Sequence, residues 1–246
     1  MISGLTEDLF LGGKVNILQP VKGYRAGVDP VMLAASVPAT PGQRVLDLGC
    51  GVGTAALCLA ARVPDLGITG VEVQPEYADL AVRNGAGRLE VFIADLSDLP
   101  ATLLQRQFDH VIANPPYYDP DSRRAGRDRG REAAIGERTP LSTWVKVAAK
   151  RLAPKGQAHF IHRAERLPDL LSAMAPLLGS LEVLPIVPRA ARLTDRVIVR
   201  ARKNGRAAFK LHPPLVMHSG PSHLRDGDSF MPQVAAVLRD GAALPF

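Results

Sequence analysis

The stretch "VLDLGCGVG", residues 45–53, decides the fold of this chain. An apolar segment that is typical of a buried strand runs into three glycines at alternate positions, Gly49, Gly51 and Gly53. Such glycines let a backbone turn sharply and approach a ligand closely where a helix begins. A dinucleotide-binding turn would have glycine at the next position, where this chain has Thr54. The turn is therefore predicted to bind a ligand other than a dinucleotide.

Two acidic residues accompany the glycine-rich turn. Asp47 lies at the end of the strand that leads into it, and Glu72 lies at the end of the next predicted strand. A carboxylate at Glu72 can accept hydrogen bonds from both hydroxyls of a ribose. Together the two side chains predict a pocket for a ligand that carries an ammonium group and a ribose diol.

Apolar, β-rich segments alternate with segments of helical spacing over most of the chain. This alternation predicts an α/β fold with a parallel sheet covered on both faces. Pro75 stands at a first helical position, and Asn204–Gly205 before residues 206–211 indicates a hairpin. The predicted strands are 44–48, 68–73, 89–94, 109–113, 157–162, 181–187 and 196–202, and the predicted helices are 53–63, 75–86 and 140–156.

A second stretch, "VIANPPYYDP" at residues 111–120, leaves a predicted core strand through Asn114, Pro115, Pro116 and Tyr117. Each proline fixes its own φ and biases the preceding residue toward extended geometry, so the exit is stiff. By itself this pattern fits a tight turn as well as a site. Its position after the glycine-rich turn favours a site.

The chain is basic, with a net charge of +6 and a pI near 9.6, which fits a polyanionic partner. The residues just after the two prolines form an arginine-rich segment, for which a solvated loop without a ligand is the alternative. A second basic group spans residues 189–210, where the only acid is Asp195. The arginines predicted to bind nucleic acid are Arg123, Arg124, Arg127, Arg129 and Arg131.

Other features of the sequence limit the possible classes of protein. The start of the chain lacks the layout of a signal peptide and no apolar run is long enough to span a bilayer, so we expect a cytoplasmic protein. Cys50 and Cys58 show no metal or disulfide pattern and are expected to be free thiols. His159 and His162 are at strand spacing, and we expect them to pack or to lie on the surface rather than to act in catalysis.

The segments "VLDLGCGVG", "GVEV", "FIADLSDL" and "NPPY" resemble, in this order, the class I S-adenosylmethionine-dependent methyltransferases of the branch that methylates exocyclic amines. The resemblance implies a Rossmann-like sheet, mostly parallel with an antiparallel C-terminal strand. It also implies S-adenosylmethionine as cofactor, with product S-adenosylhomocysteine, and no metal. Its implied contacts are Asp47, Gly49, Gly51 and Gly53 to the methionine end, Glu72 to the ribose and Asp95 to the adenine amino group.

Within that branch, three segments of the chain, at residues 23–37, 131–152 and 160–171, are similar to bacterial tRNA adenine methyltransferases that modify an adenine beside the valine anticodon. The arginine-rich segment and the residues after 215 match that family less clearly. Arg25 and Asp29 are predicted to contact the cofactor carboxylate or to close the pocket. The alternative is that Asp29–Pro30 is an ordinary helix start.

This resemblance gives the stiff strand exit a chemical role. The lone pair of an aromatic amine is delocalised, so fixed acceptors are needed to align it with a methyl donor. The Asn114 side-chain oxygen and the Pro115 carbonyl are predicted to accept the two amine hydrogens, with Pro116 holding them in place. Tyr117 is predicted to stack on a base removed from its neighbours.

The expected reaction is methylation of the 6-amino group of an adenine in tRNA, in the anticodon loop, with no obligate protein partner and no membrane. Alternatives are a glutamine methyltransferase acting on release factors, a DNA adenine methyltransferase and a non-enzymatic RNA-binding module. We expect one methyltransferase domain over 1–246. Within it, 1–43 are expected to close the cofactor pocket, 44–203 to form the catalytic core and 204–246 a C-terminal extension.

Overall fold

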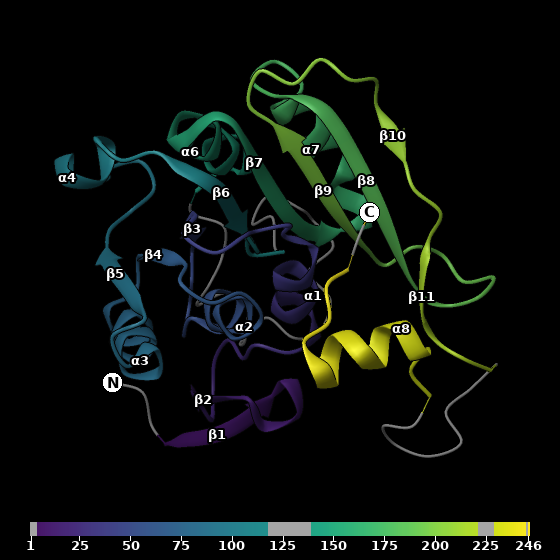
Figure 1. Cartoon of the computed structure of the whole chain (residues 1–246), viewed down its shortest axis with the longest axis horizontal. Helices are drawn as coiled ribbons and strands as arrows, with labels where there is room; N and C mark the ends of the chain where they lie inside the picture. Colours follow the sequence, from purple (N-terminus) through teal and green to yellow (C-terminus); the bar gives the residue numbers. More distant parts are fainter. Residues whose placement is uncertain (1–3, 118–138, 221–228, 245) are drawn as a thin grey trace.

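A twisted sheet runs through the centre of the chain, with helices on both of its faces (Figure 1). The computed structural model describes residues 4–117, 139–220, 229–244 and 246. Over this part of the chain the strand order is β10-β8-β9-β7-β6-β3-β4-β5, with β11 paired to β8. The strands are β3 (Arg44–Leu48), β4 (Gly67–Glu72), β5 (Leu89–Ile93), β6 (Phe108–Ala113), β7 (Leu152–Arg163), β8 (Gly179–Arg189), β9 (Arg196–Arg202), β10 (Lys210–Leu211) and β11 (Leu215–His218).

Strand directions confirm the predicted class. The pairs β3–β4, β3–β6, β4–β5 and β6–β7 are parallel, and β9 is antiparallel to both β7 and β8. The strand order therefore reverses between β3 and β6, so that loops leaving the carboxyl ends of these two strands diverge. In open α/β sheets, ligands bind at such a switch point.

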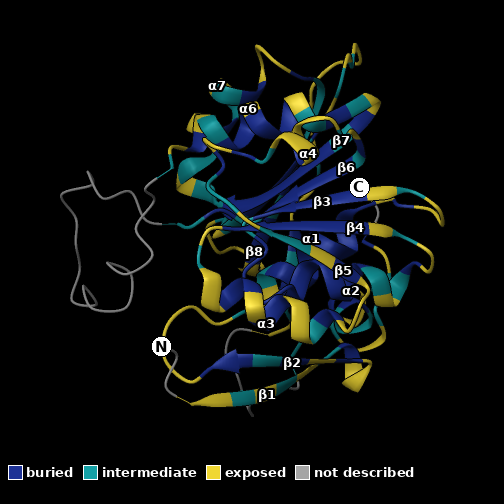
Figure 2. Cartoon of the chain, turned by 90° about the vertical axis from the view of Figure 1, so that its left-hand side faces the viewer, coloured by how far each residue is buried: buried dark blue, intermediate teal, exposed yellow. Residues whose placement is uncertain are grey.

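Helices on the two faces form two separate cores. In Figure 2 the buried sheet lies between α4, α6 and α7 above and α1, α2 and α3 below. Phe108 and Phe160 are fully buried on the first side, and Met32 and Leu57 on the second. The helices are α1 (Val28–Ser36), α2 (Thr54–Arg62), α3 (Pro75–Gly85), α4 (Ala101–Leu104), α6 (Leu141–Arg151), α7 (Leu167–Met174) and α8 (Pro232–Ala235).

The N-terminal segment adds a hairpin beneath the sheet. Strands β1 (Leu5–Phe10) and β2 (Val15–Pro20) pair antiparallel around the short 3-10 turn η1 (Leu11–Gly13). Asn84 of α3 joins this hairpin to the glycine-rich turn, because its amide nitrogen donates to the carbonyls of Leu18 (3.1 Å) and Val52 (2.9 Å). The remaining short turns are η2 (Ala164–Arg166) and η3 (Ala236–Asp240).

The predicted hairpin at Asn204–Gly205 is wrong. After β9 the chain does turn there, with Asn204 at φ 57°, but β10 pairs parallel with β8 instead of antiparallel with β9. The reason is a close backbone approach, since a Cβ on Gly205 would collide with Gly179 at the start of β8. Gly205 thus lets the chain cross β8 and follow its outer edge.

Three other expectations concern single residues. Cys50 and Cys58 are buried free thiols, as predicted. His159 and His162 are fully buried in β7, which agrees with the predicted packing role. Within the described residues, no helix combines the length and the apolar character needed to cross a bilayer.

Candidate active site

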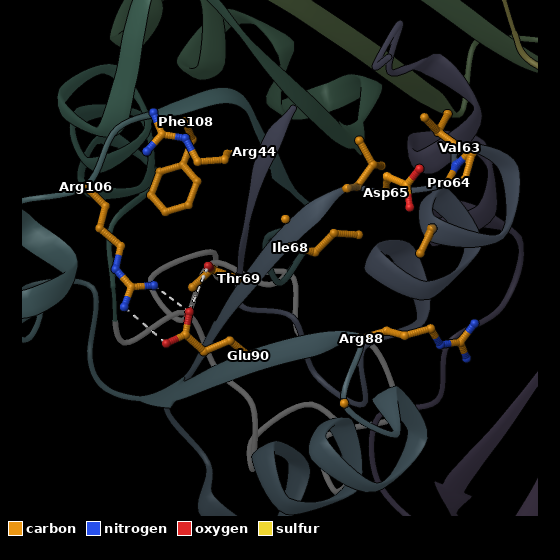
Figure 3. A pocket seen from close by; sticks show the side chains of 14 residues that line it. Arg44, Val63, Pro64, Asp65, Ile68, Thr69, Arg88, Glu90, Arg106 and Phe108 are labelled. Atoms are coloured by element: carbon orange, nitrogen blue, oxygen red, sulfur yellow. Dashed lines mark hydrogen bonds and ion pairs between the residues drawn. The ribbon is translucent and has the colours of Figure 1, made fainter. Parts of the chain in front are cut away.

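Two cavities of similar size lie at opposite ends of the parallel strands. One, of about 620 Å³, lies at the amino ends of β3, β4 and β5. Figure 3 shows it, with the Arg106 guanidinium bound to the Glu90 carboxylate across its wall. The other, of about 520 Å³, lies at the carboxyl ends of β3, β4 and β6. We assign the site to the second cavity, because ligands of open α/β sheets bind at the carboxyl ends.

The glycine-rich turn forms the floor of this second cavity. Gly49, Gly51 and Gly53 have φ of 63°, 55° and 87°, which only glycine adopts readily. A Cβ on Gly49 would also collide with the Trp144 ring of α6. Gly49 and Gly51 therefore bring the backbone to the cavity surface. Gly53 does not line the cavity; a Cβ there would come within 3.0 Å of Leu89, and it is the N-cap of α2.

Asp47 lies at the inner end of the cavity. The side chain is 2% exposed, and Oδ2 has no hydrogen-bond partner among the described residues. Burial, together with the nearby Glu72 carboxylate, raises the pKa of Asp47 to about 8, although a backbone hydrogen bond from Ala56 acts in the opposite direction. The hydroxyl of Thr54, which also lines the cavity, is likewise buried without a partner in the described part of the chain.

Both oxygens of the Glu72 carboxylate accept a backbone hydrogen bond. Its Oε2 accepts the N–H of Gly51 and its Oε1 accepts the N–H of Gln74, each at 2.9 Å. Burial raises the pKa of Glu72, and these backbone hydrogen bonds oppose the rise. Each oxygen keeps a further lone pair, so the carboxylate can accept two more hydrogen bonds from a ligand.

Asp95 follows β5 and lies on the cavity wall. Its Oδ1 accepts hydrogen bonds from the backbone N–H (2.8 Å) and the hydroxyl (2.7 Å) of Ser97, which lower the pKa of the Asp95 carboxyl. The side chain therefore caps a local turn and also borders the cavity. Asp98, which follows, is exposed.

Asn114 and the residues after it leave β6 at the mouth of the cavity, and all four motif residues line it. The Asn114 amide is fixed by two tyrosines. Its Nδ2 donates to the Tyr24 hydroxyl at 3.2 Å, and its Oδ1 lies 3.1 Å from the Tyr117 hydroxyl. Pro115 is buried, while Pro116 and Tyr117 are half-buried. The amide oxygen thus has a defined direction.

Asp29 does not line the cavity in the described structure; it lies behind the motif. Its carboxylate accepts from the Tyr117 hydroxyl and pairs with Arg196 of β9 at 3.1 Å. Arg25 lies between β2 and α1 and contacts the N-terminal hairpin, where it pairs with Asp8 at 2.6 Å and donates to the Thr6 hydroxyl at 2.7 Å. A contact of Arg25 or Asp29 with the cofactor stays a prediction. The arginines at 123–131 lie outside the described residues.

Several residues of the site have no sequence signal of their own. Tyr24, Tyr77 and Trp144 line the cavity, from the segment before α1, from α3 and from α6. The Tyr77 hydroxyl donates to the Tyr24 carbonyl at 3.3 Å, which attaches the N-terminal segment to the cavity rim. In the sequence, Trp144 is one apolar position of an amphipathic helix. Its place beside the cavity is seen only in the structure, where its ring lies so close to Gly49 that a Cβ there would collide with it.

The residues present fit S-adenosylmethionine. The partnerless Asp47 Oδ2 and Thr54 Oγ1 are acceptors for an ammonium group, and the Glu72 carboxylate suits a ribose diol. The turn at 49–53 lets a ligand lie against backbone. Cys50, whose pKa is raised well above its ordinary value by burial, adds a neutral thiol to the wall.

Comparisons with known proteins agree with this geometry. Residues 27–184 match the family model "Methyltransferase small domain". A Porphyromonas gingivalis protein named tRNA1(Val) (adenine(37)-N6)-methyltransferase is 33% identical over 68% of this chain and 69% of its own length. A protein of the same name from Actinobacillus succinogenes is 30% identical over 73% of this chain and 77% of its own. A crystal structure described as a predicted O-methyltransferase, from Agrobacterium tumefaciens, is 29% identical, covers 89% of this chain and 99% of its own, and has a TM-score of 0.71.

Proposed function

The chain belongs to the methyltransferase small domain family of S-adenosylmethionine-dependent methyltransferases, and we propose that it methylates the 6-amino group of an adenine in the anticodon loop of a tRNA. The observation that carries the proposal is the position of Asn114, at the mouth of the cavity and with its amide oxygen directed by two tyrosines. The names of the relatives from Porphyromonas gingivalis and Actinobacillus succinogenes support the substrate.

Each cofactor contact is assigned from an acceptor or a close approach in the cavity. Asp47 binds the ammonium group, Glu72 the ribose hydroxyls, and Asp95 the adenine amino group. Gly49 and Gly51 bring the backbone against the methionine end, and Gly53, which does not line the cavity, turns the chain into α2. When bound, S-adenosylmethionine supplies an electrophilic methyl group on a sulfonium.

Asn114 and Pro115 make the amine of the base reactive. The Asn114 Oδ1 and the Pro115 carbonyl each accept one hydrogen of the 6-amino group, which localises the nitrogen lone pair and supports the positive charge that develops as the nitrogen is methylated. Pro115 and Pro116 hold both acceptors in place, so little reorganisation is needed during the reaction. As the nitrogen–methyl bond forms, the sulfonium–methyl bond breaks and leaves a neutral thioether, and the nitrogen then loses one of these hydrogens as a proton to water.

The base must reach this motif from outside the cavity. Tyr117 is half-buried at the mouth, where its ring can stack on an extruded adenine. An unpaired loop presents such a base at low cost, which favours an anticodon loop over a duplex. The net charge of +6 fits the phosphate backbone, and we assign Arg123, Arg124, Arg127, Arg129 and Arg131 to that contact from the sequence alone.

The test is transfer of labelled methyl groups from S-adenosylmethionine to tRNA from a strain that lacks the enzyme, followed by nucleoside analysis. We expect labelled 6-methyladenosine from the wild-type chain and none from Asn114→Ala. A synthetic anticodon stem-loop, compared with the same hairpin carrying guanine at the target position, locates the site.

Two other outcomes would replace the proposed substrate. Label that enters only release factors indicates a glutamine methyltransferase, because a side-chain amide presents the same planar NH2 group. Label that enters only DNA indicates a DNA adenine methyltransferase. In either case the assignment of the cofactor cavity and of Asn114 stands and the tRNA assignment is wrong.

A further inference from the structure

The hydroxyl of Tyr117 faces two acceptors at once. It contacts Asp29 Oδ2 and lies 3.1 Å from Asn114 Oδ1. Burial and the charge of Asp29 raise the pKa of the Tyr117 hydroxyl well above its ordinary value, so it keeps its single proton. That proton can be donated to only one of the two oxygens at a time.

The two acceptors are not equal. A carboxylate is a stronger acceptor than an amide oxygen, and Asp29 is paired with Arg196, whose Nε is 3.1 Å from Oδ2. The Tyr117 proton is therefore directed to Asp29. Asn114 Oδ1, which the reaction needs as an acceptor for the amine, keeps its lone pairs free.

Arg196 also acts on the ring of Tyr117. Its guanidinium carbon lies 4.8 Å from the ring centroid, and it comes from β9, far along the chain from Asp29 in α1. His162 of β7 lies against the same ring with centroids 5.3 Å apart and planes tilted by 57°. The guanidinium and the imidazole together hold the Tyr117 ring in one orientation.

We propose that Asp29 and Arg196 are positioning residues for methyl transfer: Asp29 draws the Tyr117 proton away from Asn114 Oδ1, and Arg196 balances the charge of Asp29 and holds the Tyr117 ring in its orientation. The inference rests on the proposed function, in which Asn114 Oδ1 accepts a hydrogen from the amine. It assigns Asp29 to the catalytic motif, whereas the sequence left open a contact with the cofactor carboxylate, closure of the pocket and an ordinary helix start.

The experiment is a double-mutant cycle between Asp29→Asn and Tyr117→Phe. Asp29→Asn removes the stronger acceptor, so the Tyr117 proton turns to Asn114, and we expect kcat to fall by about tenfold while the dissociation constant of S-adenosylmethionine stays the same. In the Tyr117→Phe background there is no such proton, and Asp29→Asn is expected to change kcat by less than about twofold.

Arg196 is tested by two further variants. Arg196→Gln leaves Asp29 without its counter-ion and should lower kcat, whereas Arg196→Lys keeps the charge and should recover most of the activity. The matched control is Glu165→Gln, which breaks the Arg163–Glu165 ion pair of 3.1 Å at the same edge of the sheet. It should leave kcat unchanged.

The same cycle is measured on the free energy of unfolding, which needs no substrate. Coupling between Asp29 and Tyr117 in both kcat and unfolding supports the inference. Coupling in the free energy of unfolding alone would reduce the pair to a structural role. The positioning role is overturned if Asp29→Asn lowers kcat equally in both backgrounds. It is also overturned if Asp29→Asn weakens cofactor binding. The proposed function is tested separately, by identifying the product that the wild-type enzyme methylates. If that product is not 6-methyladenosine, the double-mutant cycle is measured with the amine that the enzyme does methylate.

Discussion

The Glu72 carboxylate accepts a hydrogen bond from the backbone N–H of Gly51, with Oε2 and the nitrogen 2.9 Å apart. This bond joins the end of β4 to the glycine-rich turn after β3, so that the proposed ribose acceptor and the floor of the cavity form one unit. Gln74 donates the matching bond to the other oxygen. The carboxylate therefore serves the shape of the turn as well as the ligand.

Glu72→Gln should weaken binding of S-adenosylhomocysteine by about ten- to a hundredfold, because hydrogen bonds to a charged group contribute roughly 1.5–3 kcal/mol. An amide cannot accept from both backbone N–H groups, since its NH2 would face one of them. Isothermal titration calorimetry measures the dissociation constant. Glu90→Gln, at the opposite end of the sheet, is the control, and equal affinities for the two variants would remove Glu72 from the ribose site.

Asp47 predicts a pH dependence of cofactor binding. With a pKa of about 8 the free carboxyl is protonated at pH 7, whereas a bound ammonium group favours the ionised form. Binding then releases a proton, and affinity rises with pH by up to about tenfold per pH unit below pH 8. Titrations at pH 6 to 7, where the ligand amine stays charged, in buffers of different ionisation enthalpy measure that proton. Asp47→Asn should bind weakly and without proton release; release that persists in this variant comes from another group.

Strands β3 to β9 and the cavity floor were predictable because their signals are local, whereas β1, β2, β10 and β11 are not among the predicted strands. The run at residues 44–48 is β3 without change, and Pro75 begins α3 as its fixed φ requires. The glycines at 49, 51 and 53 indicate a turn by themselves, because each adopts a positive φ that favours glycine. The same holds for the stiff exit at Asn114, where consecutive prolines restrict the backbone.

What the sequence did not predict depends on pairs that are distant along the chain. Asn204–Gly205 has the local chemistry of a hairpin, but Gly179 at the start of β8 determines where the chain goes next. Asp29 and Arg196 meet only because β9 inserts between β7 and β8. Local propensity contains no information on either contact, since both arise from tertiary packing.

Asn114→Ala should lower kcat by about 10²–10³-fold, the usual effect of removing one fixed group that stabilises transition-state charge. Cofactor affinity should stay within about twofold, because Asn114 is assigned to the amine and not to the cofactor. Single-turnover methylation and calorimetry give the two quantities. Asn16→Ala removes an exposed amide that binds Glu7 at 3.2 Å on the hairpin and serves as control. A normal rate for Asn114→Ala would refute the proposed mechanism.

Three buried histidines predict acid sensitivity of the fold. Burial lowers the pKa of His110 and of His162 to about 4, and that of His159 well below its ordinary value of 6.5. Between about pH 6.5 and 4 the unfolded chain binds these protons and the folded chain does not. Stability is therefore present above pH 6.5 and falls with acidification, by up to about 1.4 kcal/mol per pH unit for each histidine.

The variant His159→Leu isolates one of these contributions. His159 is fully buried, and neither ring nitrogen has a hydrogen-bond partner among the described residues, so an apolar side chain of similar size should leave stability at pH 7.5 unchanged or raised. Its urea midpoint should also fall less steeply than that of the wild type between pH 6.5 and 4.5, because one proton fewer is bound on unfolding. Parallel pH profiles for the two proteins would contradict this prediction, because they would show that His159 binds its proton equally in the folded and the unfolded chain.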